Sequence, residues 1–141
     1  MSKRTVLILC TGNSARSQMA EGLLRDEAGD RFEVFSAGTR PTHVRPEAIE
    51  AMAEIGIDIS KQRSKSVDEF VGQDLDYVIT VCDDAKETCP VFPGATQRLH
   101  WPFDDPAAVE GADAVRQAAF RRIRHQIHAR IMVFLGGDES L

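Results

Sequence analysis

The first feature with clear chemical potential is the segment C-T-G-N-S-A-R-S, residues 10–17, which joins an apolar run to an amphipathic stretch. A loop between a strand and a helix directs successive backbone N–H groups, and the positive end of the helix dipole, at one point. Arg16 adds a planar guanidinium that can bind two oxygens of one anion. We therefore predict an oxyanion site formed by Thr11, Gly12, Asn13, Ser14, Ala15, Arg16 and Ser17.

Cys10 stands at the start of this loop and is the candidate nucleophile. The positive field that attracts an anion also favours the thiolate, so we expect a lowered pKa for this thiol. Gly12 permits a tight turn, Asn13 tolerates a left-handed conformation and can brace the loop, and Ser17 can donate a hydrogen bond to the sulfur. The alternative is a buried cysteine that only packs at a strand end. The Gly-Asn-Ser sequence between a strand and a helix favours catalysis.

Cys82 and Cys89 form a second motif, separated by D-D-A-K-E-T. A zinc site needs about four ligands, usually in close pairs, and no histidine accompanies this loose pair, so we expect no metal. Three cysteines are an odd number and too few for a disulfide scaffold. Thiol–disulfide exchange and two unrelated free thiols remain as interpretations.

The third motif is F-D-D-P, residues 103–106, after the last predicted strand. A carboxylic acid on such a loop can protonate a leaving oxygen. The alternative is an ordinary acidic turn, because Asp and Pro are frequent in turns.

The elements between these motifs must bring them together. Strand and helix patterns alternate along the chain, which predicts parallel strands joined by right-handed crossovers. Ligand sites in such folds lie beyond the carboxyl ends of the strands, where Cys10 and Cys82 both fall. We predict a single α/β domain over residues 1–141, with a four-stranded parallel sheet flanked by helices. The expected strands are 5–10, 32–36, 75–82 and 98–101, and the expected helices are 17–28, 46–55 and 112–134.

Charge and hydropathy exclude several classes of function. The chain carries 17 Lys and Arg against 22 Asp and Glu, a formal charge of −5, so we expect no nucleic-acid partner. The basic residues of the last helix are accordingly interpreted as a solvated face. No apolar run approaches the ~20 residues of a membrane span, and the N-terminus does not have the pattern of a signal peptide. We expect a cytoplasmic protein with reduced thiols.

The loop C-T-G-N-S-A-R-S-Q-M-A-E-G resembles that of the low-molecular-weight protein tyrosine phosphatase fold. It is more closely similar to the thioredoxin-coupled arsenate reductases built on that fold. The resemblance covers roughly residues 4–134 and includes several blocks in the same order. These blocks are F-S-A-G-T (35–39), R-P-E-A-I-E-A-M (45–52), G-I-D-I-S (56–60), V-I-T-V-C-D-D-A (78–85), C-P (89–90) and H-W-P-F-D-D-P (100–106).

This resemblance implies a reaction and roles for five residues. Arsenate would be reduced to arsenite, with Cys10 as the nucleophile, Cys82 and then Cys89 forming a disulfide, and thioredoxin supplying the electrons. Arg16 would bind the oxyanion, and Asp105, directly before Pro, would be the acid. It also implies a monomer without a cofactor, with phosphate or sulfate competing for the arsenate site. A phosphatase, which needs only the first cysteine, is the alternative function, and a non-catalytic binder of arsenite or a soft metal through the three thiols is a third interpretation. Glutaredoxin and mycothiol systems, which use related folds, are the alternative electron donors.

Two departures from the family pattern bear on substrate and metal. Ala107, Ala108 and Val109 follow the loop Pro where tyrosine phosphatases of this fold usually have aromatic residues, which favours a small inorganic oxyanion. Some family members also bind potassium beside the loop, at positions that correspond here to Asn13, Glu21, Ser36 and Lys65. Because the last of these is a lysine, we expect no potassium site. The Lys65 ammonium could take the place of the ion, or Lys65 could be a solvated surface residue.

Overall fold

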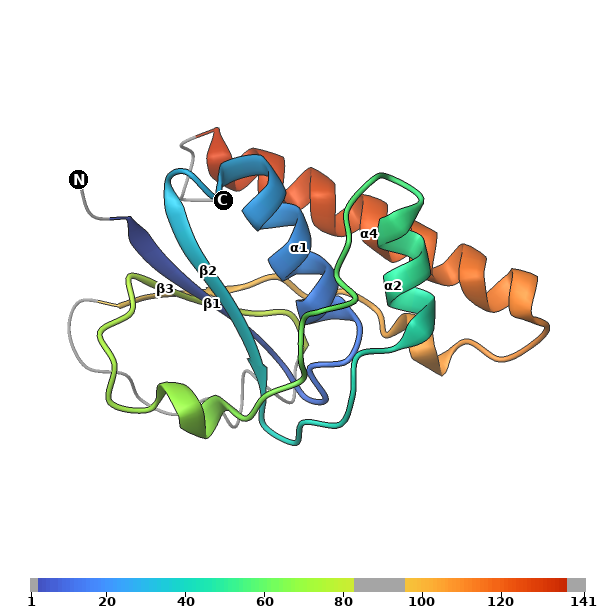
Figure 1. The fold of residues 1–141 in the computed structure, drawn as a ribbon, viewed down its shortest axis with the longest axis horizontal. Helices are drawn as coiled ribbons and strands as arrows, with labels where there is room; N and C mark the ends of the chain where they lie inside the picture. Colours follow the sequence, from blue (N-terminus) through green and yellow to red (C-terminus); the bar gives the residue numbers. More distant parts are fainter. Residues whose placement is uncertain (1–2, 83–95, 137–141) are drawn as a thin grey trace.

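The computed structural model describes residues 3–82 and 96–136. Within these ranges four parallel strands form one sheet, and three α-helices and two short 3-10 helices accompany it (Figure 1). The predicted α/β architecture with a four-stranded parallel sheet is confirmed. The strands are β1 (Arg4–Cys10), β2 (Phe32–Gly38), β3 (Tyr77–Thr80) and β4 (Gln97–His100); the helices are α1 (Arg16–Ala28), α2 (Pro46–Ala53), α4 (Asp113–Leu135), η1 (Val67–Phe70) and η2 (Pro106–Ala108).

The strand order β2-β1-β3-β4 places a change of direction between β1 and β3. From β1 the chain crosses over to β2 on one side, and then returns past β1 to form β3 on the other. The crevice at such a switch point is the usual ligand site of open parallel sheets. Cys10 ends β1, and Cys82 follows the end of β3 by two residues, so both thiols flank this point.

The central strand β1 lies between β2 and β3 and packs on α1. Val6 through Leu9 are fully buried, and their continuous apolar pattern is typical of a strand buried on both faces. The third strand is shorter than predicted: β3 spans Tyr77–Thr80, although Leu75, Val81 and Cys82 are also buried. Buried residues continue beyond the hydrogen-bonded part of the strand, so the apolar pattern alone predicted a strand longer than β3.

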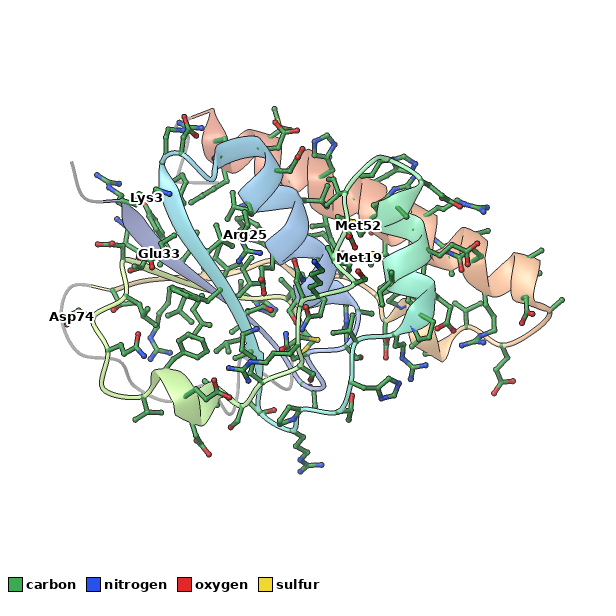
Figure 2. All side chains as sticks on the ribbon, viewed as in Figure 1. Lys3, Met19, Arg25, Glu33, Met52 and Asp74 are labelled. Carbon is green, nitrogen blue, oxygen red and sulfur yellow. The ribbon has the colours of Figure 1, made fainter. Side chains whose placement is uncertain are left out.

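The helices α1, α2 and α4 pack against one another, and α1 also packs on β1 and β2 (Figure 1). Met19 of α1 and Met52 of α2, labelled in Figure 2, are both fully buried in the core that these helices share. Gly22 makes this close packing possible, because a Cβ atom there would approach Ile59 Cγ2 to 2.7 Å. Within the described residues, no helix is both long enough and apolar enough to cross a membrane.

The apolar spacing of residues 46–55 and 112–134 predicts buried stripes that include Ala53 and Val115, and at these two positions the prediction is wrong. Val115 at the start of α4 is 53% exposed, and Ala53 at the end of α2 is also exposed, while Ala51 is buried. Both errors fall in terminal turns, where a helix runs past the elements that cover it. The remaining stripe of α4 is buried as expected, at Ala119, Ile123, Ile127 and Ile131.

The sequence suggested that the basic side of α4 is a solvated face, but several of its arginines form ion pairs. Arg116 pairs with Glu47, and both Arg121 and Arg124 pair with Glu54, so this side of the helix faces α2. Arg124 is also buried, and it donates a hydrogen bond to the Ala51 carbonyl at 2.6 Å. Internal carboxylates therefore neutralise much of the positive charge that a nucleic acid would need.

Candidate functional site

A pocket of about 230 Å³ opens at the carboxyl end of β1. The chain leaves the strand at Cys10, which is 3% exposed, and enters α1 at Arg16, so residues 11–15 form a connecting loop around the pocket. Residues from two other segments complete the wall. The lining residues are Cys10, Thr11, Gly12, Ser14, Ala15, Arg16, Thr42, Arg45, Asp105 and Ala107.

The carbonyl groups of the loop accept hydrogen bonds from outside the pocket. Every carbonyl from residue 10 to residue 15 has such a donor. C=O and N–H point in opposite directions in a trans peptide, so the N–H groups of residues 12–16 are turned away from these donors. Within the described chain they have no acceptor. The bonds are Thr39 N to Cys10 O (3.3 Å), Arg40 N to Thr11 O (2.8 Å), Thr42 N to Gly12 O (3.1 Å), Gln18 Nε2 to Asn13 O (3.0 Å), Arg45 N to Ser14 O (2.9 Å) and Met19 N to Ala15 O (2.9 Å).

This arrangement suits a tetrahedral anion. Gly12, Ser14, Ala15 and Arg16, whose N–H groups have no acceptor in the described chain, line a small pocket at the N-terminus of α1, where the helix dipole adds a positive potential. Such a cradle is fixed before any ligand arrives, which is the condition for strong electrostatic stabilisation.

Asn13 braces the loop from behind the pocket and is fully buried. It takes the predicted left-handed conformation, with φ of 47°. Its Nδ2 donates to Ser17 Oγ at 2.8 Å and to Ser36 Oγ at 2.9 Å, and its Oδ1 accepts from Gln18 Nε2 and from the Lys65 N–H, both at 2.9 Å. Ser17, expected beside the cysteine sulfur, is buried as part of this bracing.

Gly38, at the end of β2, allows the bracing to be this close. A Cβ atom at this position would lie 2.6 Å from the Thr11 carbonyl oxygen and 3.0 Å from Asn13 Cβ. No other residue type fits without moving the loop. Gly12, by contrast, has room for a Cβ and does not have a positive φ, so the turn expected there is made at Asn13 instead.

The bracing continues to a buried ion pair. The Ser36 hydroxyl donates to Glu21 Oε1, and Lys65 Nζ lies 3.6 Å from the same carboxylate oxygen. The Lys65 and Glu21 side chains are 11% and 5% exposed, and Lys65 also donates to the Arg63 carbonyl at 3.1 Å. Burial lowers the pKa of Lys65, while the Glu21 charge opposes that shift.

Lys65 is therefore not a surface residue, and the surrounding residues do not fit a potassium ion. The Lys65 ammonium already faces Glu21, which is the one buried carboxylate among these four residues. A second cation there would meet this charge in a poorly solvated place, where repulsion is strong.

Arg16 connects the loop to the candidate acid. Its Nη1 donates to the Phe103 carbonyl at 3.1 Å, and its Nη2 lies 3.8 Å from Asp105 Oδ2. Asp105 caps η2 by accepting from the Ala107 N–H at 3.0 Å, and its side chain remains 44% exposed. Asp104 does not line the pocket. The structure thus brings Cys10, Arg16 and Asp105 to one cavity.

The Cys10 thiol differs from the sequence-based expectation. Its pKa is raised, first by the hydrogen bond to Cys82 and then by burial, while the Arg16 charge and the Thr11 backbone act in the lowering direction. The expected lowering considered only the loop and the helix end. It could not include a second thiol, which reaches the sulfur only because β3 lies beside β1.

Cys82 is buried, with 6% exposure, and also interacts with Thr11 Oγ1 at 3.2 Å. Two reduced thiols are consequently neighbours: Cys10, which lines the pocket, and Cys82, which lies behind it and does not line the pocket. Cys89, the third predicted cysteine of the site, lies outside the described residues.

Sequence reasoning missed two residues of the pocket wall, Thr42 and Arg45. Arg45 belongs to the quoted block R-P-E-A-I-E-A-M, and Pro46 after it is a recognisable helix start. The pattern located α2 but gave no sign that the residue before it faces the loop. That contact depends on the crossover between β2 and β3.

Comparisons with known proteins agree with this geometry. The family described as low molecular weight phosphotyrosine protein phosphatase matches residues 5–140. An arsenate reductase of Halalkalibacterium halodurans is 48% identical over 134 residues, 95% of this chain and 96% of that protein. A solved arsenate reductase in the phosphate binding state is similar with a TM-score of 0.76 and 32% identity, over 95% of this chain and 98% of that one. A thioredoxin-dependent arsenate reductase of Corynebacterium glutamicum gives a TM-score of 0.71 at 33% identity, over 96% of this chain and 61% of that one.

Proposed function

This chain belongs to the low molecular weight phosphotyrosine protein phosphatase family, and we propose that within it the protein reduces arsenate to arsenite. One observation carries the proposal: a second buried thiol, Cys82, lies beside Cys10, which lines the oxyanion pocket. Phosphate ester hydrolysis needs one nucleophile, whereas a two-electron reduction by thiols needs two that can form a disulfide. The curated relative that is an arsenate reductase supports the same choice.

In the first step Cys10 sulfur attacks arsenic. A sulfur–arsenic bond forms and an arsenic–oxygen bond breaks, with Asp105 giving a proton so that the oxygen leaves as water. The loop N–H groups and Arg16 stabilise the charge on the remaining oxygens. Because the pKa of Cys10 is raised, its proton must leave as the substrate binds, and an oxygen of the arsenate dianion is a base within reach.

In the second step Cys82 sulfur attacks Cys10 sulfur. The sulfur–arsenic bond breaks, its electron pair stays on arsenic, and arsenite leaves while the two sulfurs are oxidised to a disulfide. The Cys82 proton goes to an arsenite oxygen. This step needs only the contact between the two thiols that the fold provides.

We further propose that Cys89 attacks Cys82, which frees Cys10 and leaves a Cys82–Cys89 disulfide for thioredoxin to reduce. The thioredoxin-dependent relative supports this electron donor. The relay requires thiols that begin each cycle reduced, so we propose a reducing compartment such as the cytoplasm, and no cofactor beyond the protein's own sulfurs.

The test is arsenate-dependent NADPH oxidation in the presence of thioredoxin and thioredoxin reductase, measured beside hydrolysis of p-nitrophenyl phosphate. Cys10→Ser should abolish both activities, since a neutral hydroxyl cannot replace the sulfur. Cys89→Ser should stop turnover but still release about one arsenite per protein in a single cycle. Cys82→Ser should release none, yet keep any phosphatase activity.

These variants separate the proposal from the alternative of a phosphatase. Efficient ester hydrolysis by the wild type without arsenate-dependent NADPH oxidation would support the phosphatase. Arsenite release by Cys82→Ser at the wild-type rate would refute the role of the second thiol.

A further inference from the structure

Arg45 gives the pocket a second guanidinium. It is the residue directly before α2, and its side chain lines the same cavity as Cys10 and Arg16. The Arg45 Nε atom is buried and has no hydrogen-bond partner, and in the described part of the chain the guanidinium forms no ion pair. A half-buried cation without a partner, facing a pocket, is unusual because unpaired buried charge is costly.

In the described part of the chain, four other partly or fully buried basic residues, Arg16, Lys65, Arg116 and Arg124, each have an acidic partner. Arg16 lies near Asp105 and Lys65 lies near Glu21, so even the pocket's own arginine shares its charge with a carboxylate. The further pairs are Arg25 with Glu21, Arg63 with Glu69, Arg116 with Glu47, and Arg121 and Arg124 with Glu54.

The backbone holds Arg45 firmly against the loop. The Arg45 N–H donates to the Ser14 carbonyl at 2.9 Å, and the N–H groups of Thr42 and Arg40 donate to Gly12 and Thr11. The Arg45 carbonyl accepts the first hydrogen bonds of α2, from Ala48 and Ile49. Residues 40–45 therefore run alongside the oxyanion loop, and these backbone hydrogen bonds leave the Arg45 guanidinium without a partner.

The arginine and aspartate residues that line the pocket determine the sign of its net charge. Among the lining side chains, Arg16 and Arg45 are positive and Asp105 is negative when ionised. Without Arg45 the other two charges cancel, and the loop N–H groups alone would have to attract a dianion. With it, the pocket has a net positive charge.

We propose that Arg45 binds an oxygen of the tetrahedral dianion directly and supplies the net positive charge that the pocket needs. This inference deepens the proposed function. That the bound anion is arsenate rests on that function. The ligand class is a small tetrahedral oxyanion in its doubly charged form, such as hydrogen arsenate or hydrogen phosphate. The contact is present before and after the chemical step, so it belongs mainly to binding.

The test compares Arg45→Ala and Arg45→Lys with Arg40→Ala. Arg40 is a matched control, because it is an exposed arginine in the same segment and does not line the pocket. Binding of inorganic phosphate to each reduced protein is measured by titration calorimetry at a pH where the dianion predominates. Arsenate kinetics follow with the thioredoxin system, and urea unfolding without phosphate establishes that each variant is folded.

Arg45→Ala should weaken phosphate binding and raise the KM for arsenate by about 10-fold or more, with little change in kcat, as expected for the loss of a hydrogen bond to a charged group. Arg45→Lys should recover part of the binding, since an ammonium keeps the charge and loses the planar fork. Arg40→Ala should stay within about twofold of the wild type.

Values within twofold of the wild type for a folded Arg45→Ala would overturn the inference. So would an equal loss in Arg40→Ala, because the effect would then be general surface charge. Phosphate binding requires no redox step. If the wild type fails to reduce arsenate while Arg45 still controls phosphate binding, the proposed function fails and the oxyanion contact stands.

Discussion

The two sides of the pocket are built in different ways. On one side, the loop after β1 has all its carbonyls bonded, and it rests on buried Asn13, which is joined through Ser36 to Glu21. On the other side, Asp105 stands after β4 on an exposed segment, held by one backbone hydrogen bond and by Arg16 at 3.8 Å. The first side is a fixed cradle and the second is a lightly held acid.

This difference corresponds to what each side would do in catalysis. A group of donors stabilises developing charge best when it is already oriented and cannot relax. A proton donor must exchange its proton with solvent in every cycle, which requires exposure. The comparison predicts that substitutions of the residues that support the loop alter stability and activity together, whereas substitution of the acid Asp105 alters activity alone.

The largest effect should come from Asn13→Ala. Buried Ser17 and the Lys65 N–H would lose their partner, Ser36 would keep only Glu21, and each buried polar group left unpaired costs about 1–3 kcal/mol. Alanine is also disfavoured at a positive φ by roughly 1–2 kcal/mol. We expect the free energy of unfolding in urea to fall by about 3 kcal/mol or more, with phosphate binding lost.

Asn13→Gly is the control for the backbone, because it permits the left-handed conformation but also lacks the amide. It should be nearly as damaging. Wild-type stability in Asn13→Gly would mean that conformation, and not the hydrogen-bond network, supports the cradle.

Asp105→Asn should affect only the reaction. Asparagine can still cap η2, so we expect the free energy of unfolding to stay within about 0.5 kcal/mol of the wild type. Loss of a general acid should lower kcat for arsenate about 100-fold. The neighbouring exposed Asp104, changed to Asn, should leave kcat unchanged. A stability loss in Asp105→Asn as large as that of Asn13→Ala would contradict the comparison.

The smallest effect concerns the thiol at the floor of the cradle. The hydrogen bond to Cys82 is the main cause of the raised pKa of Cys10, so Cys82→Ala should lower that pKa. A larger thiolate fraction at pH 7 should speed alkylation of Cys10 by iodoacetamide, about tenfold for each unit of pKa. Peptide mapping by mass spectrometry assigns the reaction to Cys10.

The pH profile distinguishes this cause from simple steric opening. In the wild type the alkylation rate should still be rising at pH 9, because the folded thiol ionises above its ordinary pKa. In Cys82→Ala the rate should level off at a lower pH. A rate that increases equally at every pH would show that the variant only admits the reagent more easily.

Much of the architecture could be predicted from local pattern. The continuous apolar run at Val6–Leu9 predicts a buried parallel strand, and the loop sequence from Cys10 to Arg16 marks an anion-binding turn before a helix. These signals are local, because an apolar period or a loop composition is fixed within a few residues. For the same reason the sequence indicated Asn13 as the residue that adopts the left-handed conformation.

The tertiary structure alone decided how distant segments modify that loop. The pKa of Cys10 is raised because β3 brings Cys82 to it, Lys65 is buried because residue 21 of α1 faces it, and Arg45 lines the pocket because residues 40–45 run beside the loop. Each effect joins residues at least 29 positions apart. Sequence determined which groups were present and which local shapes they favoured. Their charges and hydrogen bonds depend on distances in space, which only the packed sheet and its crossovers set.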